Sequence, residues 1–192
     1  MKRREILRYA ALATGAAISL PLANSLLVGC QTDATTAAVS EKLAFFGDKE
    51  TSVVKTIVDL ILPKTDSPSA SELGVHMMID QMVGNVYRPE AKAEYQENFG
   101  LFMKHLQNAG GGKGFMSLAD ADKAKLLQGL DASKEESLEK VREAYLNLKQ
   151  QTIAYYLSTE EIATNYLTYL PVPGEYEPCI SLEQAGGKAW AI

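Results

Sequence analysis

Two cysteines have the most distinctive chemistry in this sequence, because each can form a covalent bond outside the fold. Cys30 ends the segment LVGC at 27–30, which resembles a bacterial lipobox, so we expect its thiol to carry a lipid at the start of the mature chain. Acylation would leave Cys179 without a partner in its own chain, although it faces an oxidising compartment. Such a cysteine forms an intermolecular disulfide or stays free. A buried thiol that packs as a small hydrophobe is the alternative.

Cys179 ends a proline-braced loop, PVPGEYEPC, at 171–179. Proline fixes its own φ and restricts the preceding residue, so we expect a stiff loop, with Gly174 at a turn position that tolerates positive φ. A stiff loop loses little entropy on docking. A strap over the protein's own core is the alternative to a binding loop. We predict that it binds another protein, with Cys179 as the candidate intersubunit disulfide, through Pro171, Pro173, Gly174, Tyr176 and Cys179.

Residues 1–29 have the parts of an export signal. A basic start that contains Arg3 and Arg4 resembles the twin-arginine consensus, and an apolar run follows it. Pro21 interrupts this run, which argues against a stable membrane-spanning helix. We predict twin-arginine export to the periplasm and attachment through the lipid on Cys30 to a membrane whose identity the sequence leaves open. A buried N-terminal helix is the alternative.

The small polar residues after Cys30 predict a flexible tether over 30–47, so the folded domain is expected to span 48–192. This length suits one ordinary core. The formal charge of the chain is −5, and the loss of residues 1–29, which hold four basic residues and one acidic residue, makes it −8. The acidic balance excludes nucleic acid as a predicted partner, because phosphate binding needs a basic surface.

No arrangement of residues in the sequence predicts a catalytic or metal site. His76 and His105 fall on separate expected helices. Glu160 and Glu161 are neighbours on one helix, so their side chains diverge by about 100°. Asp66 stands among hydroxyl residues that are typical of a turn, and the usual motifs for zinc, haem and calcium are lacking. We therefore expect a chain that is not an enzyme and has no cofactor of its own.

Apolar residues recur at spacings of three and four throughout the body, and no alternating strand pattern of useful length occurs. The sequence therefore predicts an all-α fold, a single bundle-like domain of five to six helices with a proline-rich C-terminal loop. The expected helices cover residues 48–62, 75–87, 89–109, 117–130, 133–157 and 158–167.

Particular positions are expected to cap these helices or face the core. S-x-x-D from Ser117 and S-T-E-E from Ser158 predict N-terminal capping boxes. The helix that begins at Ser117 is expected to face the core with five residues: Leu118, Ala121, Ala124, Leu127 and Leu130. Two further stripes predict the main core: Tyr95, Phe99, Phe102 and Leu106, and then Leu138, Val141, Tyr145, Leu148, Thr152 and Tyr155.

Several short blocks together resemble the gluconate 2-dehydrogenase subunit 3 family. The most specific is PVPGxYxxC at 171–179, which follows a helix bearing residues 159–163. The resemblance covers roughly residues 50 to 190. It also includes the twin-arginine signal, VDLILP at 58–63, TDSP at 65–68, ELGV at 72–75 and Trp190.

The resemblance implies a small, cofactor-free subunit in complex with a large FAD-dependent oxidoreductase of the glucose-methanol-choline type. A multihaem cytochrome c often completes such a complex, so FAD would lie in the large subunit and haem c in a third. In such families the small subunit supports the folding and export of a flavoprotein that has no signal of its own. The lipobox at Cys30 departs from many members, so the lipid anchor rests on this sequence alone.

The favoured function is that of an accessory subunit of a periplasmic dehydrogenase that oxidises a sugar, polyol or sugar acid. Two other functions are alternatives. One is a free-standing acidic lipoprotein that binds another envelope protein or a small ligand. The other is a periplasmic enzyme with an unrecognised site. A large apolar patch on the isolated chain would favour the accessory subunit, whereas turnover by this chain alone would favour the enzyme.

Overall fold

The computed structural model describes residues 42–169, 174, 179–184 and 186–191, all of which belong to the unit 41–192. The predicted signal peptide and Cys30 lie outside the described residues. Within the described part every regular element is a helix, and the isolated β-bridge there pairs Thr168 with Trp190. The predicted all-α fold is therefore confirmed.

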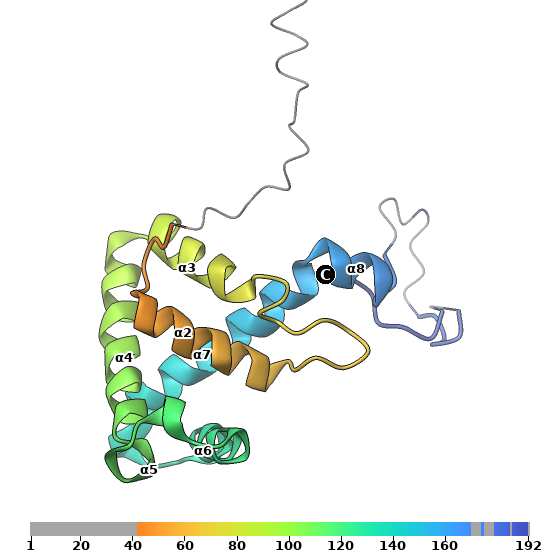
Figure 1. Cartoon of the computed structure of the whole chain (residues 1–192). Helices are drawn as coiled ribbons and strands as arrows, with labels where there is room; N and C mark the ends of the chain where they lie inside the picture. The colour runs from red at the N-terminus through yellow and green to blue at the C-terminus, as the bar shows by residue number, and fades with distance from the viewer. Residues whose placement is uncertain (1–41, 170–173, 175–178, 185, 192) are drawn as a thin grey trace, which may run out of the picture. The chain divides into compact units, whose positions relative to one another are not determined.

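The described residues form α2 (Asp48–Ile61), α3 (Val75–Asn85), α4 (Pro89–Gln107), α5 (Ala109–Gly112), α6 (Asp120–Ala132), α7 (Glu139–Ser158) and α8 (Glu160–Asn165), with 3-10 turns η1 (Phe115–Ser117) and η2 (Glu136–Leu138). The long α7 is central, because it contacts α2, α3, α4, α6 and α8 (Figure 1). Figure 1 shows α4 along one side of this domain and α8 continuing from the end of α7. None of the helices in the described part is both long and apolar enough to cross a membrane.

The stripe predicted on α4 forms the centre of the core. Phe102 is fully buried, and the rings of Tyr95 and Phe99 stack with their centroids 5.9 Å apart. Phe102 also packs against Tyr145 of α7, with 6.1 Å between ring centroids. Burial of each such side chain contributes roughly 1.5–3 kcal/mol to stability. The predicted stripe on α7 is confirmed at four positions: Val141, Tyr145, Leu148 and Thr152.

A buried carboxylate joins residues 44–46 to the domain. Asp80 of α3 is fully buried, and it accepts hydrogen bonds from the backbone N–H groups of Ala44 (2.7 Å) and Phe46 (2.7 Å). The N–H of Phe45 is a third donor, at 3.0 Å. Gly84 permits this approach, because a Cβ there would lie 2.5 Å from the Cβ of Ala44. We call this group the Asp80 clasp; it extends the packed chain N-terminal to the predicted domain start at residue 48.

The longest helix begins later than the predicted Ser133. Ser133 has an extended backbone, with ψ 138°, and its Oγ accepts a hydrogen bond from the N–H of Glu135 at 3.3 Å. Serine side chains compete in this way with helical backbone bonds. The chain therefore passes through η2 before α7 starts at Glu139.

Neither predicted capping box forms. The Oγ of Ser117 donates backward to the carbonyl oxygen of Lys113, and Ala119 is the N-cap residue of α6. The hydroxyls of Ser158 and Thr159 likewise donate to carbonyl oxygens in the last turn of α7. Free carbonyl oxygens at the end of the preceding turn explain both results, because they compete with the next helix for the hydroxyl groups.

The inward face of α6 also differs from the prediction. Ala121 is exposed, whereas Lys123 is buried with Leu127 and Leu130. Repeated steps of three residues fall about 60° short of a full turn each, so the predicted stripe drifts around the helix. The Lys123 ammonium reaches Asp120 at 2.9 Å while its stem remains buried.

Candidate functional site

The residues predicted to bind a partner fall only partly within the described structure. Gly174 has φ 71°, which agrees with its predicted tolerance of positive φ. Cys179 is an exposed free thiol, so the alternative of a buried thiol is wrong. The other predicted site residues lie outside the described part: Arg3, Arg4, Cys30, Pro171, Pro173 and Tyr176.

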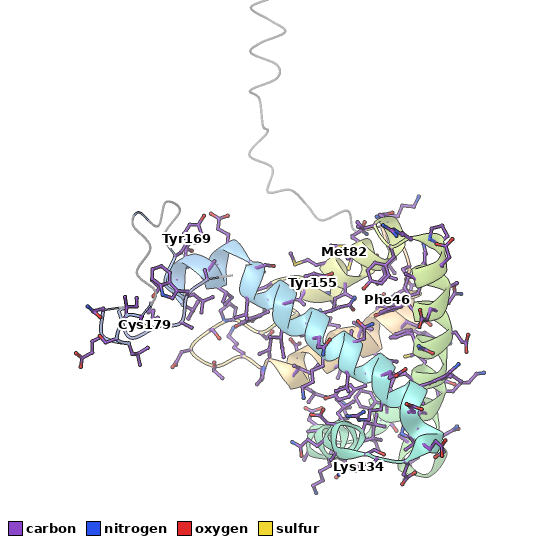
Figure 2. The ribbon with its side chains drawn as sticks, turned by 180° about the vertical axis from the view of Figure 1, so that it is seen from behind. Phe46, Met82, Lys134, Tyr155, Tyr169 and Cys179 are labelled. Atoms are coloured by element: carbon purple, nitrogen blue, oxygen red, sulfur yellow. The ribbon has the colours of Figure 1, made fainter. Side chains whose placement is uncertain are left out.

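The chain on either side of that loop exposes large apolar side chains. Tyr169 is 54% exposed, Leu182 is 68% exposed and Trp190 is 46% exposed. The backbone of Thr168 is hydrogen-bonded to both neighbours of Trp190, at 2.7 and 2.9 Å, which ties the C-terminal segment to the end of α8. Figure 2 shows Tyr169 and Cys179 at this same end of the domain. Exposed apolar groups near a free thiol make it a candidate protein-binding surface.

Two tyrosines from the end of the bundle fix the loop between α2 and α3. The Tyr156 hydroxyl donates to the carbonyl oxygen of Pro68 at 2.8 Å, and the Tyr166 hydroxyl donates to that of Asp66 at 2.9 Å. Within the loop, a hydrogen bond from Lys64 lowers the pKa of Glu72. The block at 65–68 is therefore held against α7 and the end of α8, whereas Glu72 of the block at 72–75 is bonded within the loop.

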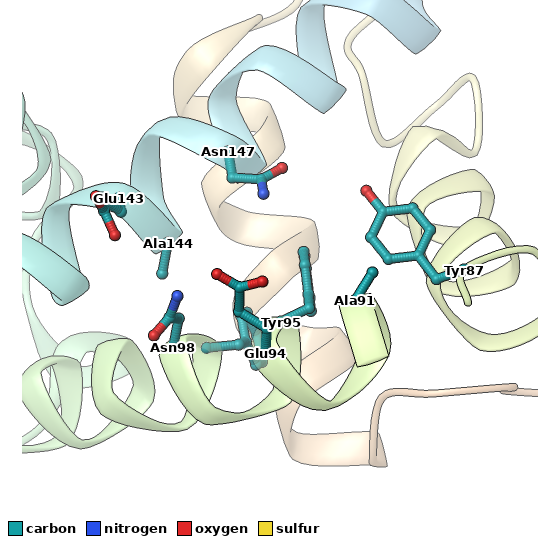
Figure 3. Close-up of a pocket in the computed structure, with 9 residues that line it drawn as sticks. Tyr87, Ala91, Glu94, Tyr95, Asn98, Glu143, Ala144 and Asn147 are labelled. Atoms are coloured by element: carbon teal, nitrogen blue, oxygen red, sulfur yellow. The ribbon is translucent and has the colours of Figure 1, made fainter. Parts of the chain in front are cut away.

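A pocket of about 380 Å³ opens between α4 and α7 (Figure 3). Tyr95 and Phe99 line it from α4, and Tyr87 closes one end with its ring perpendicular to that of Tyr95, at 5.9 Å between centroids. Ala91 and Ala144 face the pocket from the two helices. Their small side chains leave space that larger residues would fill.

Each helix presents one carboxylate and one amide to this pocket, Glu94 and Asn98 on α4 and Glu143 and Asn147 on α7. A spacing of four puts each pair on one helix face. Figure 3 shows the side chains of Glu94, Asn98 and Asn147 extending into the space between the helices. Within the described part of the chain, none of these four side chains makes a hydrogen bond or an ion pair.

The nearby cations are held by other groups. Lys140 pairs with Glu97 at 2.7 Å, and this hydrogen bond raises the pKa of Lys140 and lowers that of Glu97. Glu94 and Glu143 attract the same ammonium more weakly. Lys92 donates to a backbone carbonyl oxygen of α3 at 2.8 Å. The two pocket carboxylates are therefore left without a paired counter-charge among the described residues.

Reasoning from the sequence missed this pocket. A signal was present, because the spacing E-x-x-x-N occurs at 94–98 and again at 143–147. The repeated spacing predicts a shared pocket only if α4 and α7 are known to lie side by side. Hydrophobic periodicity predicts single helices and not which helices pack together, so the sequence alone did not reveal the pocket.

The two histidines lie in separate surroundings. His76 on α3 neighbours Lys55 and Asp59, and burial lowers its pKa. His105 lies in the last turn of α4, where a cation suits the helix dipole. Among the described residues, no three His, Cys, Asp or Glu side chains are placed to hold a metal ion.

Comparison with known proteins gives one positive finding. The family model described as gluconate 2-dehydrogenase subunit 3 matches residues 48–174, a range that contains α2 to α8 and the α4–α7 pocket. No curated protein and no solved structure matches the chain. Because the family match covers more than half of the sequence, it confirms the resemblance over residues 48–174, whereas the twin-arginine signal, Cys179 and Trp190 lie outside the matched range. The chain belongs to the gluconate 2-dehydrogenase subunit 3 family.

Proposed function

We propose that this chain is the non-catalytic small subunit of a periplasmic, FAD-dependent dehydrogenase complex of the glucose-methanol-choline type. The observation that carries the proposal is the family match over 48–174, because the family is described as the third subunit of a dehydrogenase. The chain supports folding, twin-arginine export and membrane attachment of the flavoprotein subunit. FAD lies in that large subunit, and haem c lies in a cytochrome subunit where one is present.

The exposed end beyond α8 supports a role in binding a partner. Tyr169, Leu182 and Trp190 present apolar surface there, and such surface on a soluble domain is typical of an interaction site. The thiol of Cys179 is exposed beside it. We place the flavoprotein contact on this end, through Pro171, Pro173, Gly174, Tyr176 and Cys179.

The export role is tested by replacing the arginine pair. Arg3→Lys/Arg4→Lys should leave both this chain and its flavoprotein in the cytoplasm, because the flavoprotein travels with this signal. Immunoblots of periplasmic, membrane and cytoplasmic fractions measure the distribution of both chains. Arg8→Lys, outside the pair, is the control. Normal export of the flavoprotein in the double variant would contradict the carrier role.

The covalent contact is tested at Cys179. A disulfide joins two thiols with loss of two protons and two electrons, which a thiol-oxidising protein of the periplasm accepts. Cys179→Ser should remove a high-mass band, containing this chain and the flavoprotein, from a non-reducing gel. Cys30→Ser is the matched control and should keep that band. Identical gels for the wild type and Cys179→Ser would rule out the disulfide and leave a non-covalent contact.

A further inference from the structure

The walls of the α4–α7 pocket differ from an ordinary helix–helix groove. Such grooves are usually filled by side chains at close-packed density. Here Ala91 and Ala144 leave about 380 Å³ open, and polar side chains stand around it. The polar groups come as matched pairs from facing helices, a carboxylate and an amide from each (Figure 3). The space is lined by acceptors that the described chain does not use.

The charge of the lining selects the class of ligand. Glu94 and Glu143 repel an anion, and a neutral ligand would displace water from both carboxylates without supplying a counter-charge. Lys140 supplies only a weak attraction to them, because its ammonium is held by Glu97 at 2.7 Å. A cationic group is therefore the ligand that the charge of both carboxylates favours. A cationic group also carries N–H donors, from which the amide oxygens of the two asparagines can accept hydrogen bonds.

The aromatic end of the pocket favours a planar cation over a compact one. Tyr87 stands perpendicular to Tyr95, and the Tyr87 hydroxyl accepts a hydrogen bond from the Nε2 of Gln151 at 2.7 Å, which fixes its ring. A guanidinium group stacks on aromatic faces and carries five donors in a planar fork. An ammonium group has three donors and no plane to stack. The aromatic end therefore favours the planar end of an arginine side chain over an ammonium group.

The exposure of the carboxylates decides where that arginine comes from. Glu94 and Glu143 are exposed, and ion pairs open to water contribute little to affinity. A free small cation would also lose translational and rotational freedom on binding. An arginine on a docked protein loses that freedom with the rest of its subunit, and the surrounding interface excludes water from the new pairs.

We propose that the α4–α7 pocket is the socket for an arginine side chain of the partner flavoprotein. This inference rests on the proposed function, because it requires the complex. It adds a contact at the N-terminal half of α7, whereas the Cys179 end follows the C-terminal end of α7 through α8. The partner's surface would then extend along α7 between the two contacts.

The test measures the affinity of the complex purified from membranes, with its subunits dissociated and rebound at increasing salt. Glu94→Gln/Glu143→Gln keeps the size of both side chains and should raise the dissociation constant about 30-fold, as loss of an interface hot spot does. Its salt dependence should also become weaker. Glu135→Gln/Glu136→Gln is the control, because it removes the same charge from exposed positions. The control should change the constant less than about 2-fold.

A second variant fills the pocket without changing its charge. Ala91→Phe places a ring in the space on the exposed side of α4 and should weaken binding by at least about 10-fold, while far-ultraviolet circular dichroism shows a folded domain.

Four outcomes decide the matter. Loss of affinity in both pocket variants but not in the control supports the arginine socket. Unchanged affinity in both pocket variants overturns it and leaves the proposed function standing. A wild-type chain that brings no flavin-containing partner overturns both. Thermal stabilisation of the isolated chain by agmatine below about 1 mM, lost in Glu94→Gln/Glu143→Gln, would make the pocket a small-cation site and overturn the partner arginine.

Discussion

The Asp80 clasp and the α4–α7 pocket hold carboxyl groups in opposite situations. Asp80 is fully buried, and its oxygens accept from three backbone N–H groups of residues 44–46. Glu94 and Glu143 are exposed and make no hydrogen bond or ion pair within the described part of the chain. The carboxylate of Asp80 is used by hydrogen bonds within the protein, whereas those of Glu94 and Glu143 are available to a ligand or a partner.

The role of an acidic side chain depends on whether its carboxylate oxygens already accept hydrogen bonds from the protein, and the residue type alone does not reveal that role. A buried carboxylate is tolerated only when its hydrogen bonds are made, so its loss leaves donors unpaired in the interior. An exposed carboxylate is solvated by water and adds little to the fold. The clasp should therefore matter for stability and the pocket for binding, and three variants test that division.

The largest effect is expected at Asp80. Asp80→Asn keeps the shape but turns an NH₂ group toward backbone N–H donors, so at least one of the three is left unpaired. We expect the free energy of unfolding to fall by about 2–4 kcal/mol. Urea unfolding measures it, with Asp122→Asn on the surface of α6 as the control that changes stability by less than about 0.5 kcal/mol. A loss below about 1 kcal/mol would show that the clasp does not hold residues 44–46.

A smaller effect is expected where α3 meets the same segment. Gly84→Ala adds a Cβ that would lie 2.5 Å from the Cβ of Ala44, and the resulting shift should cost about 1–3 kcal/mol. Gly100→Ala in α4 meets nothing within 4 Å and should instead gain about 0.5–1 kcal/mol from helix propensity. Thermal unfolding of both variants gives the comparison. The same sign for both would mean that the close approach at Gly84 is unimportant.

The smallest effect on stability is expected in the pocket. Glu94→Gln/Glu143→Gln removes two carboxylates that no described residue uses, so the free energy of unfolding should stay within about 0.5 kcal/mol of the wild type. Chemical denaturation of the isolated chain measures it. A loss of more than about 1 kcal/mol would show that these side chains support the fold, and the division between clasp and pocket would fail.

Periodicity predicted the helices and the stripe of α4, because Phe99, Phe102 and their neighbours report local helical geometry directly. It failed where a side chain competes with the backbone, as Ser133 does before α7. Asp80 carried a signal, a single acid within the apolar run of α3, but its partners lie 34 to 36 residues away. The pocket pairs were equally hidden, because no local pattern tells that α4 faces α7.

The central claim, that this chain is the accessory subunit of a flavoprotein complex, is tested most directly by isolating it with its partners. The tagged full-length protein is recovered from membranes in mild detergent, and the absorption spectrum of the eluate is recorded beside its subunit composition. The account predicts a co-eluting large chain with a flavin band, and haem bands where a cytochrome is bound. A colourless protein recovered alone from the soluble fraction would contradict it.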